Sequence, residues 1–262
     1  QATAAPAAAP AARWETALGA SLRTRAEGWR WFEPPPGVAA DGEYGFVGTL
    51  LRVALTARRG GLAFTVEGAA PLLVALSADA LAPPPQGQLG FGGAYRAANG
   101  GDATVARAFV KQAHVRLGAA PGARGASARL GRFELSDGAE LAPRDPTLAS
   151  LKRDRIAQRL VGPFGWTHVG RSFDGVHLAR TRAASGARGG GGDLTLAAAL
   201  PTEGAFRAAA DLALEFGLAY AAYTRNGGDA ARGRGAGDAR LFALHYADWR
   251  DVAPVDNRPA AA

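Results

Sequence analysis

Arginines and carboxylates at alternating positions are the residues of this chain that are best suited to chemistry. Only two of its 30 basic residues are lysines, and 23 acidic residues leave a formal net charge of +7. Near the N-terminus, Arg23, Arg25 and Glu27 follow one another at every second position. Such positions share one face of an extended strand. A guanidinium stays charged at ordinary pH and binds carboxylates through paired hydrogen bonds, so this face would suit anionic ligands.

Similar combinations of arginine and acid recur along the chain. Acids beside arginines keep any one site from holding an anion too tightly, which repeated weak binding requires. The candidate anion-binding residues are Arg23, Arg25, Glu27, Arg52, Arg116, Arg132, Glu134, Arg155, Arg159, Arg171 and Asp174. The other interpretation of each arginine is a solvated side chain in a protein whose Arg, Ala and Gly content reflects a GC-rich genome.

Motifs for catalysis are missing from the sequence. We find no glycine-rich phosphate loop, no metalloprotease histidine pair and no serine elbow. Cysteine is absent, which excludes disulfides, thiolate metal sites and a cysteine nucleophile. Four histidines lack ligand-like spacing and are interpreted as scattered polar positions: His114, His168, His177 and His245. We therefore expect no enzyme, no cofactor and no metal site.

The elements that would position the arginines are β-strands. Apolar and polar residues alternate in segments separated by Gly, Pro, Asp and Asn. About nine strands are predicted, near residues 17–31, 44–58, 62–69 (with continuation to 77 as the alternative), 103–117, 126–135, 172–181, 193–200, 211–225 and 239–252. Most are close to ten residues long, which suits a tilted strand crossing a bilayer, whereas soluble sandwiches more often use five or six. The pattern favours an all-β fold, a transmembrane antiparallel up-and-down β-barrel.

Two segments differ from this pattern. Residues 1–12 are rich in Ala and Pro and suit a flexible tail left by signal-peptide cleavage, or an arbitrary start. Residues 13–262 would form the barrel, with a long irregular segment at 136–171 that either folds into the pore or lies on the surface. Aromatic residues at 29, 31 and 32 fit an interfacial girdle or a packed core equally well. No run of eighteen apolar residues exists, which excludes a helical membrane protein.

Short motifs in three segments, 131–140, 151–164 and 170–176, resemble the alginate-export family of outer-membrane porins, as does the Arg23–Glu27 strand. The resemblance spans about residues 13–258. Phe133 departs from it, because the family more often has a polar residue after Gly-Arg. The resemblance implies an eighteen-stranded barrel in the bacterial outer membrane, with a lumen of arginines and acids that conducts a polyanionic polysaccharide such as alginate. A periplasmic scaffold protein is a further partner by this analogy.

Nine strands would make half of such a barrel, so we expect the N-terminal part of a longer protein. Closure as an eight- or ten-stranded barrel is the alternative. The leading function is passive export or diffusion of an anionic polysaccharide or other anionic solutes, with outer-membrane lipid as a partner. Alternatives are a general non-specific porin, a soluble basic domain binding glycan or nucleic acid, and, last, a secreted polysaccharide lyase or hydrolase. Phe216, Tyr220 and Phe242 fall on apolar faces, which disfavours binding of nucleic acid.

Overall fold

The computed structural model describes residues 13–31, 33–34, 36–84, 87–120, 123–138, 145–182, 191–229 and 234–249. The tail expected at residues 1–12, and Phe32, lie outside this part. The described elements are β1 (Glu15–Arg30), β2 (Glu43–Arg59), β3 (Leu62–Val74), α1 (Gly90–Ala98), β4 (Val105–Ala106), β5 (Phe109–Gly118), β6 (Gly125–Phe133), α2 (Pro146–Leu151), a π-helical turn (Lys152–Ile156), β7 (Phe173–Arg182), β8 (Gly191–Pro201), β9 (Phe216–Asp229) and β10 (Arg234–Asp248).

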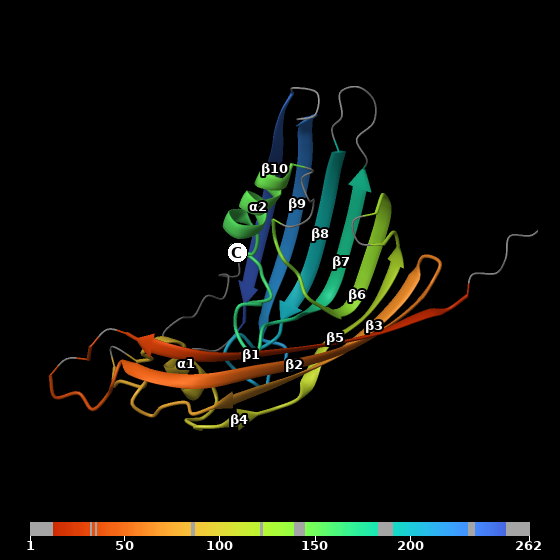
Figure 1. The fold of residues 1–262 in the computed structure, drawn as a ribbon. Helices are drawn as coiled ribbons and strands as arrows, with labels where there is room; N and C mark the ends of the chain where they lie inside the picture. The colour runs from red at the N-terminus through yellow and green to blue at the C-terminus, as the bar shows by residue number, and fades with distance from the viewer. Residues whose placement is uncertain are drawn as a thin grey trace, which may run out of the picture.

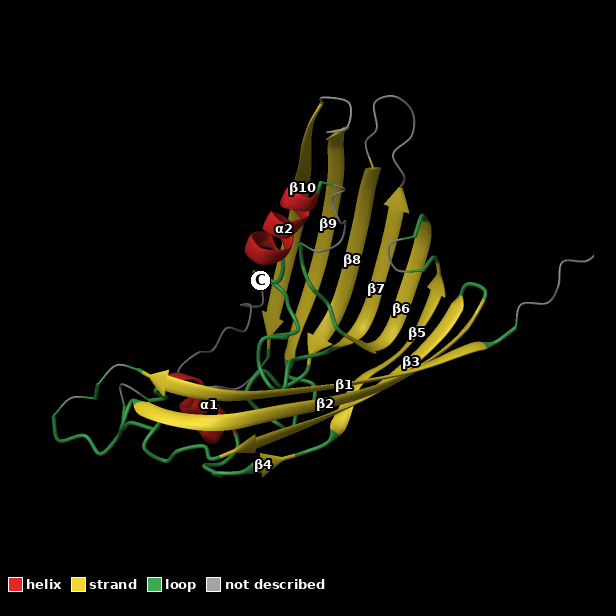
Figure 2. Cartoon of the chain, viewed as in Figure 1, coloured by secondary structure: helices red, strands yellow, loops and turns green. Residues whose placement is uncertain are grey.

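Nine long strands form one antiparallel meander, and the two-residue β4 adds to β3. Each long strand pairs with the next long strand along the chain, from β1 to β10. In Figure 1, β7–β10 stand roughly upright while β1–β3 run across the lower part of the view, so the sheet is strongly curved and twisted. Figure 2 shows how little of the described chain is helical. The predicted all-β, up-and-down antiparallel architecture is confirmed.

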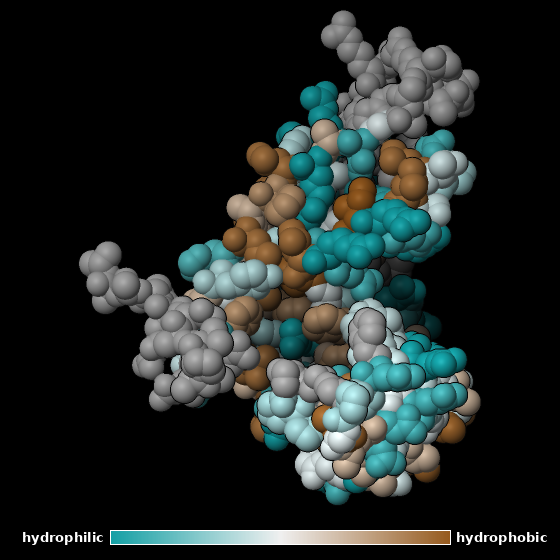
Figure 3. Space-filling model, turned by 90° about the vertical axis from the view of Figure 1, so that its left-hand side faces the viewer, coloured by the Kyte–Doolittle hydropathy of each residue, from teal (hydrophilic) through white to brown (hydrophobic). Residues whose placement is uncertain are grey.

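The two faces of the sheet differ sharply in polarity. We call the face that carries Arg23 and Arg25 the inner face and the opposite one the outer face. Large apolar side chains on the outer face are well exposed, with Leu18 and Leu241 each at 77%. The others include Leu22, Val47, Leu51, Val53, Leu55, Phe64, Val66, Leu72, Leu117, Leu130, Leu178, Leu194, Leu196 and Leu200. In the upper part of Figure 3, many hydrophobic side chains are exposed at the surface of the molecule.

One packed core lies on the inner face beside α1. Phe46 and Leu73 from the strands, Tyr95 from α1 and Val169 from a later loop belong to the same buried cluster. Trp29 packs against this cluster, with its ring centroid 4.6 Å from that of Phe91. Trp29 therefore belongs to a packed core, which is one of the two interpretations given for the aromatic residues at 29, 31 and 32.

Helix α1 was not predicted from the sequence, because its glycines indicated a loop. A Cβ atom at Gly92 would overlap the ring of Tyr44, and one at Gly93 would overlap the carbonyl of Ala80. Because both positions are glycine, α1 can lie directly on β2 and on the segment around Ala80 that precedes the helix. Close packing, and not helix propensity, therefore decides this element.

A second core joins β6–β9. It contains Phe133, Phe173, Leu218 and Tyr220, all on the inner face. The described part of the long segment predicted at 136–171 packs next to it through Val161, and it contains α2 and the π-helical turn. Lys152 Nζ donates to Asp238 of β10 at 2.9 Å. Among the described residues, no helix is long and apolar enough to cross a membrane.

Candidate anion-binding surface on the inner face

Two arginines of β1 attach a distant loop to the inner face. Arg23 donates to the carbonyl oxygens of Gly165, at 2.8 Å, and Thr167. Arg25 Nη2 donates to the carbonyl oxygen of Trp166, also at 2.8 Å. The loop at 165–168 therefore lies on the inner face of β1 and β2. These guanidinium groups bind backbone oxygens in the way they would bind an anion.

His168 is the centre of this attachment and is fully buried. Its Nε2 lies 2.9 Å from Glu27 Oε1, a carboxylate that accepts, and 3.1 Å from Arg25 Nη2, a guanidinium that donates. Arg25 Nη2 lies 3.0 Å from the same Glu27 oxygen. A Cβ atom at Gly48 would overlap the His168 ring, so this glycine provides the niche that the ring occupies.

Burial controls the ionisation of the loop contacts. It lowers the pKa of His168 below its ordinary value, against the opposing effect of the hydrogen bond to Glu27. Burial raises the pKa of Tyr95 to about 12. The Tyr95 hydroxyl accepts a hydrogen bond from the backbone N–H of His168 at 2.9 Å. Both groups are therefore neutral at pH 7 and contribute hydrogen bonds, not charge, to this site.

A second network on the inner face balances its charges. Arg52 of β2 forms ion pairs with Glu67 of β3 and, at 3.2 Å, with Glu134. Gln112 Nε2 donates to Glu67 at 2.7 Å. Lys111 is almost fully buried and lies 3.6 Å from Glu134. Two cations and two carboxylates therefore compensate one another, as buried charges require.

An irregularity in the sheet brings Lys111 into this network. The pairing of β3 with β5 shifts between Glu67 and Gly68, so that Glu67 faces Gln112 and Gly68 faces Val110. Such a bulge lets two consecutive residues of β5 escape strict alternation. The side chains of Lys111 and Gln112 can therefore both lie on the inner face.

The two networks meet at a cavity of about 280 Å³. Side chains of Arg23, Arg52, Lys111 and Glu134 line it, together with the loop at 165–170. Three cations and one carboxylate face this space. A small anion that entered it would find N–H donors on both sides.

The structure brings together five of the predicted site residues and separates the rest. Arg23, Arg25, Glu27, Arg52 and Glu134 all belong to the two networks around the cavity. The predicted strand at 126–135 ends instead at Phe133, which leaves Glu134 outside the strand alternation.

Arg132 and Asp174 lie on the outer face, in contrast to the expected lumen position. They face each other across β6 and β7 and form a bidentate pair with distances of 2.7 and 2.6 Å. Asp174 is also opposite Leu200, one of the exposed apolar residues. The alternation was predicted correctly, but Arg132 and Glu134 were assigned to one face because the end of the strand was not foreseen.

The remaining predicted arginines do not reach the cavity. Arg155 and Arg159 are exposed, on the π-helical turn and just after it, and Arg159 Nε donates to the Arg155 carbonyl. The guanidinium of Arg171 lies 4.8 Å from the centre of the Phe164 ring. Arg116 is on the inner face but several residues away along β5, opposite Arg129.

Three residues of the networks were not predicted from the sequence: Lys111, Glu67 and His168. Lys111 and Glu67 lie on predicted strands, and their polar character inside apolar segments was a usable signal. His168 had no such signal, because it follows Trp166 and Thr167 in an irregular segment. It was interpreted as a scattered polar position, and the structure places it buried against β2 with Glu27 as a partner.

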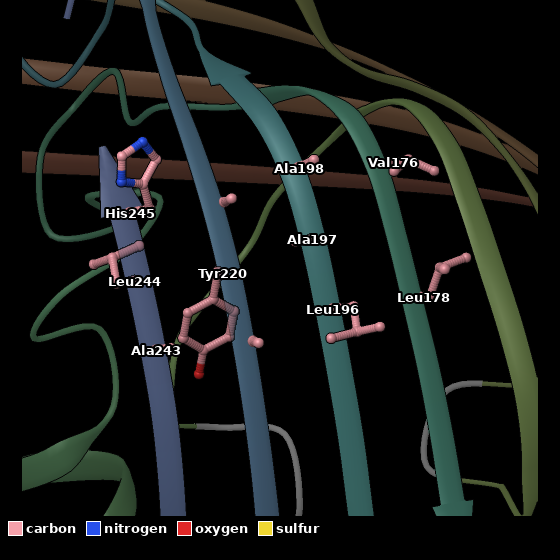
Figure 4. A pocket seen from close by; sticks show the side chains of 11 residues that line it. Val176, Leu178, Leu196, Ala197, Ala198, Tyr220, Ala243, Leu244 and His245 are labelled. Carbon is pink, nitrogen blue, oxygen red and sulfur yellow. The ribbon is translucent and has the colours of Figure 1, made fainter. Parts of the chain in front are cut away.

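The outer face carries a shallow trough with a volume of about 430 Å³ (Figure 4). Leu178, Leu196, Ala198 and Ala243 line it, with His245 at one end. Small alanine side chains form part of the trough, and larger apolar side chains lie beside them. The trough offers contacts to an apolar chain and no set of polar groups for chemistry.

No family model, curated protein or solved structure matches this chain. Among the described residues, no group of three His, Asp or Glu side chains is arranged to hold a metal ion.

Proposed function

We propose that this chain forms part of an outer-membrane β-barrel that lets anionic solutes, including an anionic polysaccharide of the alginate type, pass through a lumen lined by arginines. One observation carries the proposal: the outer face of a long-stranded meander is apolar and exposed while the inner face is charged. Lipid-facing apolar residues that alternate with polar lumen residues are the signature of a membrane barrel.

Exposure of the outer face supports contact with lipid. Leu130 and Val66 are 61% and 54% exposed, and they belong to a surface that extends over most strands of the sheet. Soluble monomeric proteins seldom leave a continuous apolar surface of this kind facing water. The outward Arg132 is neutralised by Asp174, so it does not leave a lone charge in this surface.

The open edges of the sheet support a larger barrel. Strands β1 and β10 end the meander and do not pair with each other in the described part of the chain. An open edge is not viable in lipid, because its backbone groups would lack hydrogen-bond partners. We propose that these nine long strands are about half of an eighteen-stranded barrel whose further strands cover both edges.

The cavity at Arg23 and Arg52 supports selectivity for anions. Fixed positive charge in a narrow, water-filled passage raises the local concentration of anions and lowers the barrier to their passage. The nearby Glu134 weakens the binding at any one point, so that an anion can leave again. A network whose charges nearly cancel suits the passage of an anion better than its tight binding.

Conductance of the full-length protein in planar bilayers tests the proposal. Arg23→Ser with Arg52→Ser should lower the anion-to-cation permeability ratio, measured from reversal potentials, by about tenfold. The matched control removes the outer pair, Arg132→Ser with Asp174→Ser, and should keep the selectivity. Absence of conductance, or an unchanged ratio in the Arg23 and Arg52 variant, would refute the proposal. Block of the current by long polyuronate chains distinguishes a polysaccharide channel from a general porin.

A further inference from the structure

Basic residues from three neighbouring strands gather at a different part of the inner face. Arg116 of β5 lies directly opposite Arg129 of β6, and Arg129 lies opposite His177 of β7. His114 occupies the next inner position along β5. These four residues form one patch, which we call the basic cluster.

Hydrogen bonds define which atoms of the basic cluster can donate. Arg129 Nε donates to His177 Nδ1 at 3.2 Å. Because a guanidinium only donates, this Nδ1 accepts. His114 Nδ1 lies 3.2 Å from the carbonyl oxygen of Arg132, which only accepts, so His114 carries its proton on Nδ1.

The two arginines of the cluster are not neutralised by acids. Among the described residues, no carboxylate forms an ion pair with Arg116 or Arg129. Arg116 donates instead to the carbonyl oxygens of Gly118 and Ala119, and Arg129 lies over the Phe133 ring at 4.6 Å. Like charges directly opposite each other on a sheet are destabilising. A bound anion would remove this repulsion.

The charge and the shape of the cluster select the kind of anion. Two arginines at paired positions on neighbouring strands supply two positive charges and several N–H donors. A carboxylate brings one negative charge and two oxygens, whereas sulfate and phosphate groups bring up to two charges and three or four strong acceptors. We propose that the basic cluster of Arg116, Arg129, His177 and His114 binds a dianionic oxyanion of the sulfate or phosphate-ester class. The physiological role of this site rests on the proposed anion-conducting lumen.

Sulfate is the probe for this site, with acetate as the singly charged comparison. Isothermal titration of the full-length protein in an uncharged detergent should show at least about tenfold tighter binding of sulfate than of acetate. Arg129→Gln and Arg116→Gln should each weaken sulfate binding by about tenfold or more. The matched control is Arg58→Gln, which changes an exposed arginine of the same cross-strand row that already pairs with Glu15. It should leave sulfate binding unchanged.

Equal affinity for sulfate and acetate, or undiminished sulfate binding in both cluster variants, would overturn the inference. Circular dichroism of each variant shows whether its sheet is retained, and two independent substitutions guard against one that fails to fold. The titration needs no membrane and no current. A protein that binds sulfate but does not conduct would therefore refute the proposed function alone, and one that conducts without binding sulfate would refute this inference alone.

Discussion

The inner face carries two regions that use the same residue types in opposite ways. In the β1–β3 region, Arg52 lies between Glu67 and Glu134, and Arg25 contacts Glu27. In the β5–β7 region, Arg129 lies between another arginine and a histidine. Alternation places all these arginines on one face, but the neighbour across the strand decides whether the charge is already compensated. The compensated region also holds a protein loop, whereas in the other region no described carboxylate forms an ion pair with Arg116 or Arg129.

Removal of an acid from the compensated region should have the largest effect. Glu67→Ala leaves Arg52 and Lys111 with too little negative charge in a buried setting and should lower the free energy of unfolding by about 3 kcal/mol. Glu15→Ala, which breaks an exposed pair with Arg58, should change it by less than about 1 kcal/mol. Urea titration of both variants in detergent measures the difference. Similar losses for the two would mean that Glu67 is not part of a buried network.

Filling the niche for His168 should release the loop of the compensated region. Gly48→Val places methyl groups where the His168 ring lies and should cost about 1–3 kcal/mol. The control is Gly28→Val on β1, where a Cβ atom would meet nothing within 4 Å. Hydrogen exchange at residues 165–170 should speed up in the first variant only. Unchanged exchange would show that the niche does not hold the loop.

Acid should loosen the same loop. Burial lowers the pKa of His168, so the attached form binds a proton less readily than the released form. The contribution of His168 to attachment is therefore fully present above the ordinary histidine pKa of about 6.5 and is lost as the pH falls below it. Exchange at residues 165–170 should be faster at pH 5 than at pH 7.5, and His168→Asn should remove this difference. Equal exchange in the parent protein at both values would contradict it.

Removal of a charge from the basic cluster should have the smallest effect and the opposite sign. Arg116→Gln relieves the repulsion with Arg129 and should raise the free energy of unfolding by about 0.2–1 kcal/mol in sulfate-free buffer. Added sulfate should cancel the advantage by stabilising the parent protein more than the variant. A loss of stability in sulfate-free buffer would show that Arg116 is compensated after all.

Much of the fold could be predicted because alternation is a local property. Leu51 and Arg52, or Leu130 and Arg129, point to opposite faces of any extended strand, whatever the strand pairs with. The strand order followed as well, since consecutive strands of a meander are neighbours. The predictions were wrong at a strand end and at glycines. Glu134 was predicted to lie in a strand that ends at Phe133, and α1 formed where Gly92 and Gly93 indicated a loop.

By itself, the sequence determined which side chains share a face, that one face is apolar, and that arginine dominates the charge of the other. Only the tertiary structure decided which of these charges meet. Glu27 and His168 are 141 residues apart in the chain, and Arg52 and Glu134 are 82 apart. Their contacts depend on sheet curvature, on the bulge at Glu67 and on the loop packed beside α1. No period in the sequence encodes these, because they arise from packing between segments that are distant along the chain.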